Sequence, residues 1–351
     1  MTLLAPERRD TRTDTGTDVE TEFVRIIDQL TRRGLLAGGV GSATLLGLAA
    51  CGASDPSASS TPSVPSTRTV QTAKGSVRVP ADPKRVVSIQ PAATATLYDL
   101  GLASIGVYDQ GSEYISPRYR AKWDAATKVG TAGAIDVEKV ATLNPDLIIG
   151  LDYEWNTNVY SKLTALAPTV IAPATSWQGT AAIVADAVNR TDQLDALKTR
   201  LVTRSAEIKK AYATQLAAYT WDILQGGFTA GQFWVYGPRT DPGRVLADAG
   251  VRFAGATTAA TASKDPGAGI LAVSYEQIGK LDDAGVIGFY ADYDDKPNNK
   301  GPQLFAQKLW KQLPAVKAGR LVPFPDLLVG GYGDALAVLD ELEAGLKKLQ
   351  G

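Results

Sequence analysis

The chain of 351 residues contains no histidine and only one cysteine. Histidine is the side chain that enzymes use most often as a general base and the one that most often binds metals, so its absence excludes the usual Ser/His relay and many metal centres. A single cysteine cannot form a disulfide within the chain. We therefore expect no catalytic residues and no metal bound directly by the protein.

A bias of charge toward either sign is also lacking. The sequence has 36 Lys and Arg against 37 Asp and Glu, and no basic block stands out. Proteins that bind nucleic acids usually carry a basic patch or stripe. A nucleic acid is therefore not an expected partner.

Apolar runs of the roughly 20 residues that a membrane-spanning helix needs are missing as well. The longest apolar stretch ends at Ala50, is interrupted by glycines, and follows the pair Arg32-Arg33. A basic pair before a short apolar segment with small residues at its end predicts an export signal over residues 1–50. The arginine pair favours a twin-arginine signal, and a general secretory signal is the alternative.

The lone cysteine, Cys51, stands at the end of this segment. It closes Leu48-Ala49-Ala50-Cys51, which resembles the lipobox of bacterial lipoproteins, so we expect lipidation at Cys51. Residues 51–68 are rich in Ser, Pro and Thr, a composition that is typical of a flexible tether. These features predict a protein outside the cytoplasm that a lipid anchors to the outer face of the cell membrane.

After the tether, short apolar runs alternate with helical stretches. Arg85–Ile89 is such a run, Pro91 then opens a helical stretch, and Ser104–Tyr108 is the next run. The pattern continues with a helix over 136–143 and a strand over 146–150. Alternation of this kind is typical of parallel sheets with helical crossovers and predicts an α/β fold.

The same pattern returns later in the chain. The helix–strand unit at 137–150 is echoed at 275–288, and 97–102 is echoed at 246–251. This repetition predicts two similar lobes, over 69–190 and 217–351.

Between the two lobes, apolar residues from Leu194 to Tyr212 form one helical stripe, which predicts a helix over 191–216. A helix of that length can cross from one lobe to the other, and a single continuous helix resists large hinge motion.

Four segments resemble the iron-siderophore and cobalamin class of substrate-binding proteins of ABC importers. They are Pro83–Ser88, Val129–Thr131, Val137–Ile148 and, most specifically, Leu309–Leu321. The resemblance covers about residues 69 to 349. It implies two Rossmann-like lobes with parallel sheets joined by one long interlobe helix.

The resemblance also implies a function. The chain would be the extracellular solute-binding component of an ABC importer, a monomer that captures a ferric siderophore between its lobes and delivers it to the permease and ATPase complex. Iron would be bound only through the siderophore, with no intrinsic cofactor. Hydroxamate siderophores are favoured because their ferric complexes carry little charge, whereas ferric tris-catecholates need several arginines. Cobalamin and haem stay open.

Ligands of such α/β lobes gather beyond the carboxyl ends of the strands. Aromatic side chains there offer wide apolar faces with a polar tip, and an arginine can donate to chelate oxygens. The candidate ligand-binding residues are Tyr108, Trp155, Trp177, Tyr236, Arg239, Tyr293, Phe324 and Tyr332. A second basic and aromatic cluster, formed by Tyr114, Arg118, Tyr119 and Arg120, is interpreted as a solvated face, and Trp310 as core.

Members of this class dock on the permease through an acidic residue at the tip of each lobe. Glu154 is the candidate in the first lobe, and the contact of the second lobe stays open.

Two other classes of protein remain as alternatives, an exported α/β hydrolase and a surface adhesion or signalling lipoprotein. The missing Gly-x-Ser-x-Gly elbow and the missing histidine argue against the hydrolase.

Overall fold

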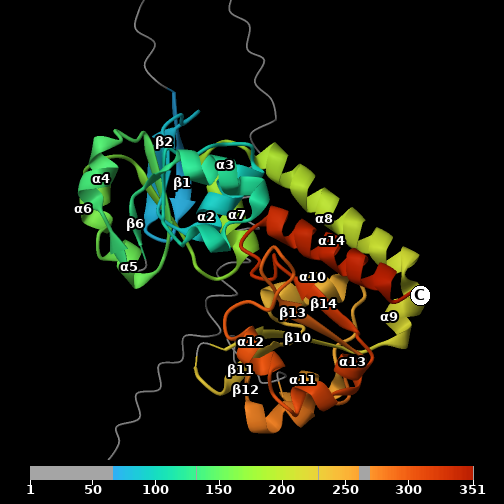
Figure 1. Cartoon of the computed structure of the whole chain (residues 1–351). Coiled ribbons are helices and arrows are strands. Elements are labelled where there is room, and N and C mark those ends of the chain that lie inside the picture. The colour runs from blue at the N-terminus through green and yellow to red at the C-terminus, as the bar shows by residue number, and fades with distance from the viewer. Residues whose placement is uncertain (1–65, 132, 228, 261–268, 351) are drawn as a thin grey trace, which may run out of the picture. The chain divides into compact units, whose positions relative to one another are not determined.

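The structure is a computed structural model that describes residues 66–131, 133–227, 229–260 and 269–350 (Figure 1). The predicted export signal, Cys51 and nearly all of the tether lie outside these residues. Within the described ranges, no helix has both the length and the apolar composition that crossing a membrane requires.

The first lobe is built on a five-stranded parallel sheet with the order β5-β4-β3-β8-β9. Its central strands are continuous apolar runs that are buried on both faces, as helix-covered parallel strands must be. The strands are β3 (Val86–Ser88), β4 (Gly106–Val107), β5 (Thr127–Lys128), β8 (Leu147–Leu151) and β9 (Thr169–Ala172). The helices are α2 (Pro91–Asp99), α3 (Pro117–Ala125), α4 (Val137–Thr142), α5 (Glu154–Thr157), α6 (Tyr160–Thr164) and α7 (Trp177–Ala187).

Short elements complete this lobe. Two antiparallel hairpins are formed by β1 (Thr67–Thr72) with β2 (Gly75–Pro80) and by β6 (Gly130–Thr131) with β7 (Ala134–Ile135). A 3₁₀ turn, η1, spans Ser112–Tyr114. The predicted helix over 136–143 is α4, and its N-cap is Asp136, whose carboxylate accepts the backbone N–H of Lys139 at 2.9 Å.

The second lobe contains another five-stranded sheet, with the order β12-β11-β10-β13-β14. Its strands are β10 (Trp221–Gly226), β11 (Gln232–Tyr236), β12 (Ile270–Ser274), β13 (Val286–Tyr290) and β14 (Leu321–Phe324). Strands β10, β13 and β14 are parallel as predicted, but β11 and β12 run antiparallel to their neighbours. A connection without a crossover helix joins β10 to β11, and such a connection produces an antiparallel pair.

The helical elements of the second lobe lie between and after these strands. They are α10 (Asp241–Asp248), α11 (Gly255–Ala260), η2 (Tyr275–Leu281), α12 (Gly301–Phe305), η3 (Trp310–Gln312), α13 (Pro314–Lys317) and α14 (Tyr332–Lys348). Trp310 is 2% exposed and stacks on Phe305 with ring centroids 4.3 Å apart, so the prediction that it belongs to the core is confirmed.

The two sheets share one strand order. In each, the first strand is central, the second and third lie on one side, and the fourth and fifth on the other.

The helices in the echoed segments 97–102 and 246–251 also end in the same way. Gly101 and Gly250 have φ of 82° and 96°, and the next residue donates to a carbonyl five positions back, Leu97 at 2.9 Å and Leu246 at 3.0 Å. These equivalent helix ends support a duplicated lobe.

The chain passes from the first lobe to the second through α8 (Thr191–Ala211), whose 21 residues span about 30 Å. The predicted single helix to residue 216 is interrupted, because Tyr212 leaves the helical conformation and α9 (Ala213–Ala218) follows. The ring of Tyr212 is buried, and its hydroxyl donates to Glu343 of α14 at 2.8 Å.

Helix α14 lies alongside α8 (Figure 1). Arg204 of α8 donates to Asp340 at 2.9 Å and to Glu343 at 2.5 Å. At its other end, α14 begins with Tyr332, whose ring packs edge to face on Trp177 of α7 with centroids 4.8 Å apart. Two helices therefore tie the lobes together, although only α8 carries the chain between them.

The two glycine caps provide a matched test of the fold. An alanine at either position must adopt a left-handed backbone, at a cost of about 1 kcal/mol. A Cβ at position 101 meets no atom within 4 Å, whereas one at position 250 meets Lys209 Cγ at 3.1 Å and Leu216 Cδ1 at 3.3 Å. In urea unfolding, Gly101→Ala should lower the free energy of unfolding by about 1 kcal/mol and Gly250→Ala by more. Unchanged stability of both variants would contradict the assigned helix ends.

Candidate functional site

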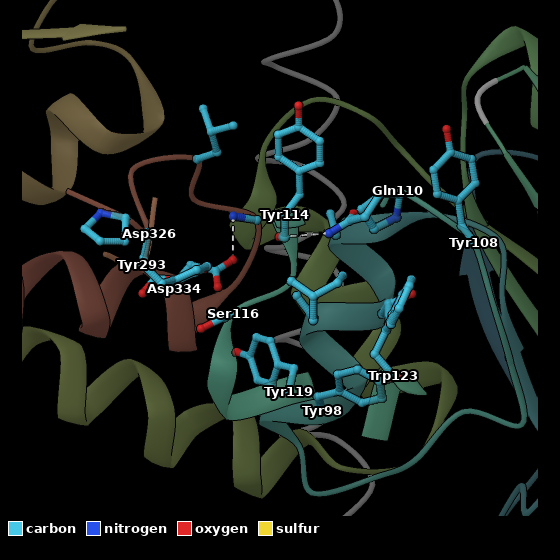
Figure 2. A pocket seen from close by; sticks show the side chains of 18 of the residues that line it. Tyr98, Tyr108, Gln110, Tyr114, Ser116, Tyr119, Trp123, Tyr293, Asp326 and Asp334 are labelled. Atoms are coloured by element: carbon cyan, nitrogen blue, oxygen red, sulfur yellow. Dashed lines mark hydrogen bonds between the residues drawn. The ribbon is translucent and has the colours of Figure 1, made fainter. Parts of the chain in front are cut away.

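A cavity of about 340 Å³ opens between the carboxyl-end loops of the two sheets. Its first-lobe wall comes from the start of α2, the loop after β4, and α3, and its second-lobe wall comes from the segments after β13 and β14. Figure 2 shows the side chains around this cavity, with two aspartates from the second lobe among the tyrosines. Aromatic side chains dominate the lining, namely Tyr98, Tyr108, Tyr114, Tyr119, Trp123, Tyr290 and Tyr293.

These phenols are hydrogen-bond donors at neutral pH. Burial raises the pKa of Tyr98 to about 12 and also raises the pKa values of Tyr290 and Tyr293. The same cause, followed by the charge of Asp109, raises the pKa of Tyr108. The wall therefore offers flat apolar faces that end in neutral hydroxyl groups.

Beside the cavity, an arginine of the first lobe meets carboxylates of the second. Arg118 of α3 donates to Asp326 at 3.0 Å and also to Asp334 of α14, and its guanidinium lies 4.6 Å from the centroid of the Tyr119 ring. Tyr293 donates its hydroxyl to the same Asp326 oxygen at 3.1 Å. Asp326 and Asp334 both line the cavity, so the contact between the lobes forms part of its wall.

Further carboxyl groups surround this contact. Asp99 of α2 accepts from the hydroxyl of Tyr119 and from the backbone N–H of Gly333 at 2.9 Å. Glu341 of α14 accepts the backbone N–H of Asp326 at 3.0 Å. Burial raises the pKa of Asp334 to about 7 and raises the pKa values of Asp99 and Glu341 as well. Four acidic residues therefore lie around a single guanidinium group, that of Arg118.

A second cavity, of about 410 Å³, adjoins the first. Leu328, which is 49% exposed and follows β14, lines both cavities. The lining of the second is polar and consists of Thr175, Ser176, Tyr236, Arg239, Thr240, Asp241, Pro242, Arg244, Gly269, Ile270, Leu328 and Val329.

The predicted ligand-binding residues divide among three environments. Tyr108 and Tyr293 line the first cavity, and Tyr236 and Arg239 line the second. The other described side chains of the set are packed in the core and line neither cavity: Phe324 is 0% exposed, Trp177 5% and Tyr332 5%.

The remaining predicted residues include two that the structure describes only in part or not at all. Trp155 lies in α5, and its side chain is outside what the structure describes. Cys51 also lies outside the described residues. Glu154 begins α5 with an exposed side chain that lines neither cavity.

The interpretation of the second basic and aromatic cluster as a solvated face is only partly right, because Tyr114 is 43% exposed whereas Tyr119 is buried. Tyr114 and Tyr119 line the first cavity, and Arg118 bridges the lobes. Arg120 donates to backbone carbonyls of its own segment, Ser112 and Ile115. The start of a helix at Ser116-Pro117, in the connection that follows β4 and contains η1, is the signal that places this cluster beyond the carboxyl end of a sheet strand.

Sequence reasoning missed several wall residues. Tyr98 and Trp123 lie on α2 and α3, where helical periodicity does not distinguish a core position from a cavity wall. Tyr290 is the last residue of β13, and its place in an apolar run predicts a buried strand residue. Asp334 was not singled out, because its partner Arg118 is more than 200 positions away in the sequence.

Comparison with known proteins places this geometry in context. The family model described as "Periplasmic binding protein" matches residues 86–327. The chain is 30% identical over 319 residues to the probable siderophore-binding lipoprotein YfiY of Bacillus subtilis, covering 84% of this chain and 93% of that protein. It is 28% identical to the iron(3+)-hydroxamate-binding protein FhuD of the same organism, covering 78% and 84%.

A solved structure shows the same fold. It is the siderophore periplasmic binding protein from the fuscachelin gene cluster of Thermobifida fusca, with a TM-score of 0.67 and 29% identity. The match covers 77% of this chain and 98% of that structure.

The raised pKa of Asp334 predicts how stability depends on pH. In the folded protein the carboxyl group of Asp334 keeps its proton up to about pH 7. In the unfolded chain, where the pKa of an aspartate is 3.8, the group loses this proton at a lower pH. This carboxyl group therefore stabilises the fold most below about pH 4, and its contribution is lost as the pH rises through about 7. Between pH 7.5 and pH 5 the wild-type free energy of unfolding should rise more than that of Asp334→Asn, by roughly 1 kcal/mol or more.

Urea unfolding at the two pH values measures this difference. Asp99 and Glu341, whose pKa values are also raised, remain in both proteins and contribute to both curves, as does the charge of Arg118. Equal pH dependence of the two proteins would show that Asp334 is not a buried, proton-holding carboxyl group.

Proposed function

This chain belongs to the periplasmic binding protein family, and we propose that it is the monomeric substrate-binding component of an ABC importer that captures a ferric siderophore. The observation that carries the proposal is the aromatic cavity between the carboxyl-end loops of two duplicated lobes. Family membership favours a binding protein over the exported hydrolase and over the adhesion or signalling lipoprotein.

The cavity suits the organic surface of a metal chelate. Its rings provide wide apolar faces, and the hydroxyl groups of Tyr108 and Tyr290 would donate to oxygens at the rim of the chelate. The hydroxyl groups of Tyr119 and Tyr293 already donate to aspartates of the protein. In this function the siderophore supplies every ligand of the iron, and the protein recognises the complex from outside. No cofactor of the protein's own is needed for this capture.

The charge of the cavity favours a hydroxamate siderophore. Among the described residues that line it, none is Lys or Arg, whereas Asp326 and Asp334 are acidic. Arg118 already donates to both of these aspartates, so the described lining offers no cation for the several negative charges of a ferric tris-catecholate. A ferric trihydroxamate is close to neutral and needs no such cation.

Tryptophan fluorescence tests the proposal. Trp123 lines the cavity, and quenching by a ferric centre falls steeply with distance, so a bound ferric trihydroxamate should quench this tryptophan most. Trp123→Phe should lose the largest single share of the quench, while Trp310→Phe, in the core of the second lobe, should retain most of it.

Titrations with iron-loaded and iron-free chelator complete this experiment. The ferric complex should bind at least about tenfold more tightly, a difference of about 1.4 kcal/mol. If calorimetry detects no binding of ferric hydroxamates, catecholates or carboxylates, the proposed function is wrong.

Delivery to the transporter involves two more residues in our proposal. Lipid chains on Cys51 would hold the protein at the outer face of the membrane after export by the twin-arginine or the general secretory route. The exposed Glu154, at the start of α5, would contact the permease from the first lobe. Glu154 lines neither cavity of the described structure.

These roles predict uptake defects without binding defects. Cys51→Ser should move the protein from the membrane fraction to the soluble fraction or the medium. Glu154→Lys should stay in the membrane fraction and reduce uptake of radioactive iron–siderophore, because it reverses a docking charge. The control Glu138→Lys makes the same charge change at another exposed site of the first lobe and should transport normally. Membrane retention of Cys51→Ser, or normal uptake by Glu154→Lys, would contradict the corresponding role.

A further inference from the structure

We propose that the second cavity is a subsite for a carboxylate-bearing arm of the siderophore, held by Arg239 and Arg244, while the ferric centre occupies the first cavity. The inference rests on the proposed function. It implies that the two ends of the ligand differ in charge, with a nearly neutral chelate at one end and an anionic group at the other.

The two cavities are placed to share one ligand. Leu328 lines both, so they are neighbouring compartments on either side of one half-exposed side chain. On the first-lobe side, the second cavity lies beyond the carboxyl end of a parallel strand, since Thr175 and Ser176 follow β9, whereas its second-lobe residues Tyr236 and Arg239 end and follow the antiparallel strand β11. A linear ligand that enters the first cavity and passes Leu328 therefore reaches the second.

The sign of the charge changes between the compartments. The first cavity is lined by Asp326 and Asp334 and, among described residues, by no cation. Among the described residues, the second is lined by two arginines against one aspartate, Asp241. Burial raises the pKa of Asp241, and the charge of Arg244 acts in the other direction. A carboxylate is thus disfavoured in the first compartment and favoured in the second.

The local structure holds the two arginines close together. Nε of Arg244 donates to the backbone carbonyl of Arg239 at 3.0 Å, across the start of α10. Thr240 between them caps this helix by accepting the N–H of Gly243 at 3.1 Å. Within the described residues, the bond from Nε is the one hydrogen bond of the Arg244 guanidinium, so its two terminal nitrogens remain to donate to a carboxylate.

A neighbouring hydroxyl adds a polar contact from the first lobe. Ser176 accepts the N–H of Gly179 at 3.1 Å as the N-cap of α7, and this bond leaves its hydroxyl hydrogen for another acceptor. Donors from both lobes therefore border the second cavity. Guanidinium groups bind planar carboxylates through paired hydrogen bonds, which makes a carboxylate the anion that fits best.

Three ferric trihydroxamates with the same linear backbone test the subsite. In one, the terminal amine is left as an ammonium group; in the second it is acetylated and neutral; in the third it is succinylated and ends in a carboxylate. Dissociation constants measured by calorimetry at low ionic strength should rank the succinylated form tightest, about fivefold or more below the acetylated form. The acetylated form measures recognition of the chelate itself.

Variants assign the effect to the arginines. In Arg239→Gln/Arg244→Gln the ratio of the acetylated to the succinylated dissociation constant should fall to about one. The control Arg200→Gln removes an exposed arginine from α8, away from both cavities, and should keep the wild-type ratio.

The outcomes separate this inference from the function on which it rests. Equal affinity for the acetylated and succinylated forms, a preference for the ammonium form, or an unchanged ratio in the double variant would each overturn the subsite and leave siderophore binding intact. Failure of all three complexes to bind would instead contradict the hydroxamate assignment.

Discussion

The cleft depends on one contact between the lobes, the guanidinium of Arg118 with Asp326 and Asp334. The contact links α3 of the first lobe to the loop after β14 and to the first turn of α14. Hydrogen bonding to Asp326 and the charge of Asp334 offset the cost of burying Arg118 and raise the pKa of its guanidinium, so it remains charged. Removing Arg118, whose side chain is 30% exposed, would leave the largely buried carboxyl groups of Asp326 and Asp334 without their cation. Because Arg118 is occupied in this way, the first cavity presents phenols and carboxyl groups to a ligand.

The helices around this contact restrict how the lobes can move. Helix α8 carries the chain between the lobes, and Arg204 ties it to α14. The first turn of α14 in turn contacts Asp99 of α2 and Trp177 of α7 in the first lobe. A packed pair of helices bends less easily than extended crossover strands, so we expect a cleft that is formed before the ligand arrives. In this account the transporter recognises small shifts of the loops at the cleft.

The sequence predicted the scaffold well because its signals are local. Continuous apolar runs defined β3, β8 and β13, and the echo of 97–102 at 246–251 agreed with the shared strand order of the two sheets. The rule that ligands gather beyond the carboxyl ends of strands located Tyr108 and Tyr293, which line the first cavity.

What the sequence did not predict depends on long-range packing. An aromatic residue near a strand end fits both a core and a binding site, and the core holds Trp177, Phe324 and Tyr332. The pairing of Arg118 with Asp326 joins residues 208 positions apart, and no local pattern indicates it. The antiparallel direction of β11 follows from its connection to β10, which hydrophobic periodicity does not reveal.

The most direct test of the account is a crystal structure of the protein with a bound ferric trihydroxamate, with iron located by its anomalous scattering. We expect the iron peak in the first cavity, beside Tyr293 and Tyr108, and Arg118 within hydrogen-bonding distance of Asp326, as in the present structure, where the distance is 3.0 Å. Iron at another surface, or lobes rotated so far that Arg118 leaves both Asp326 and Asp334, would contradict the claim of a preformed siderophore cleft.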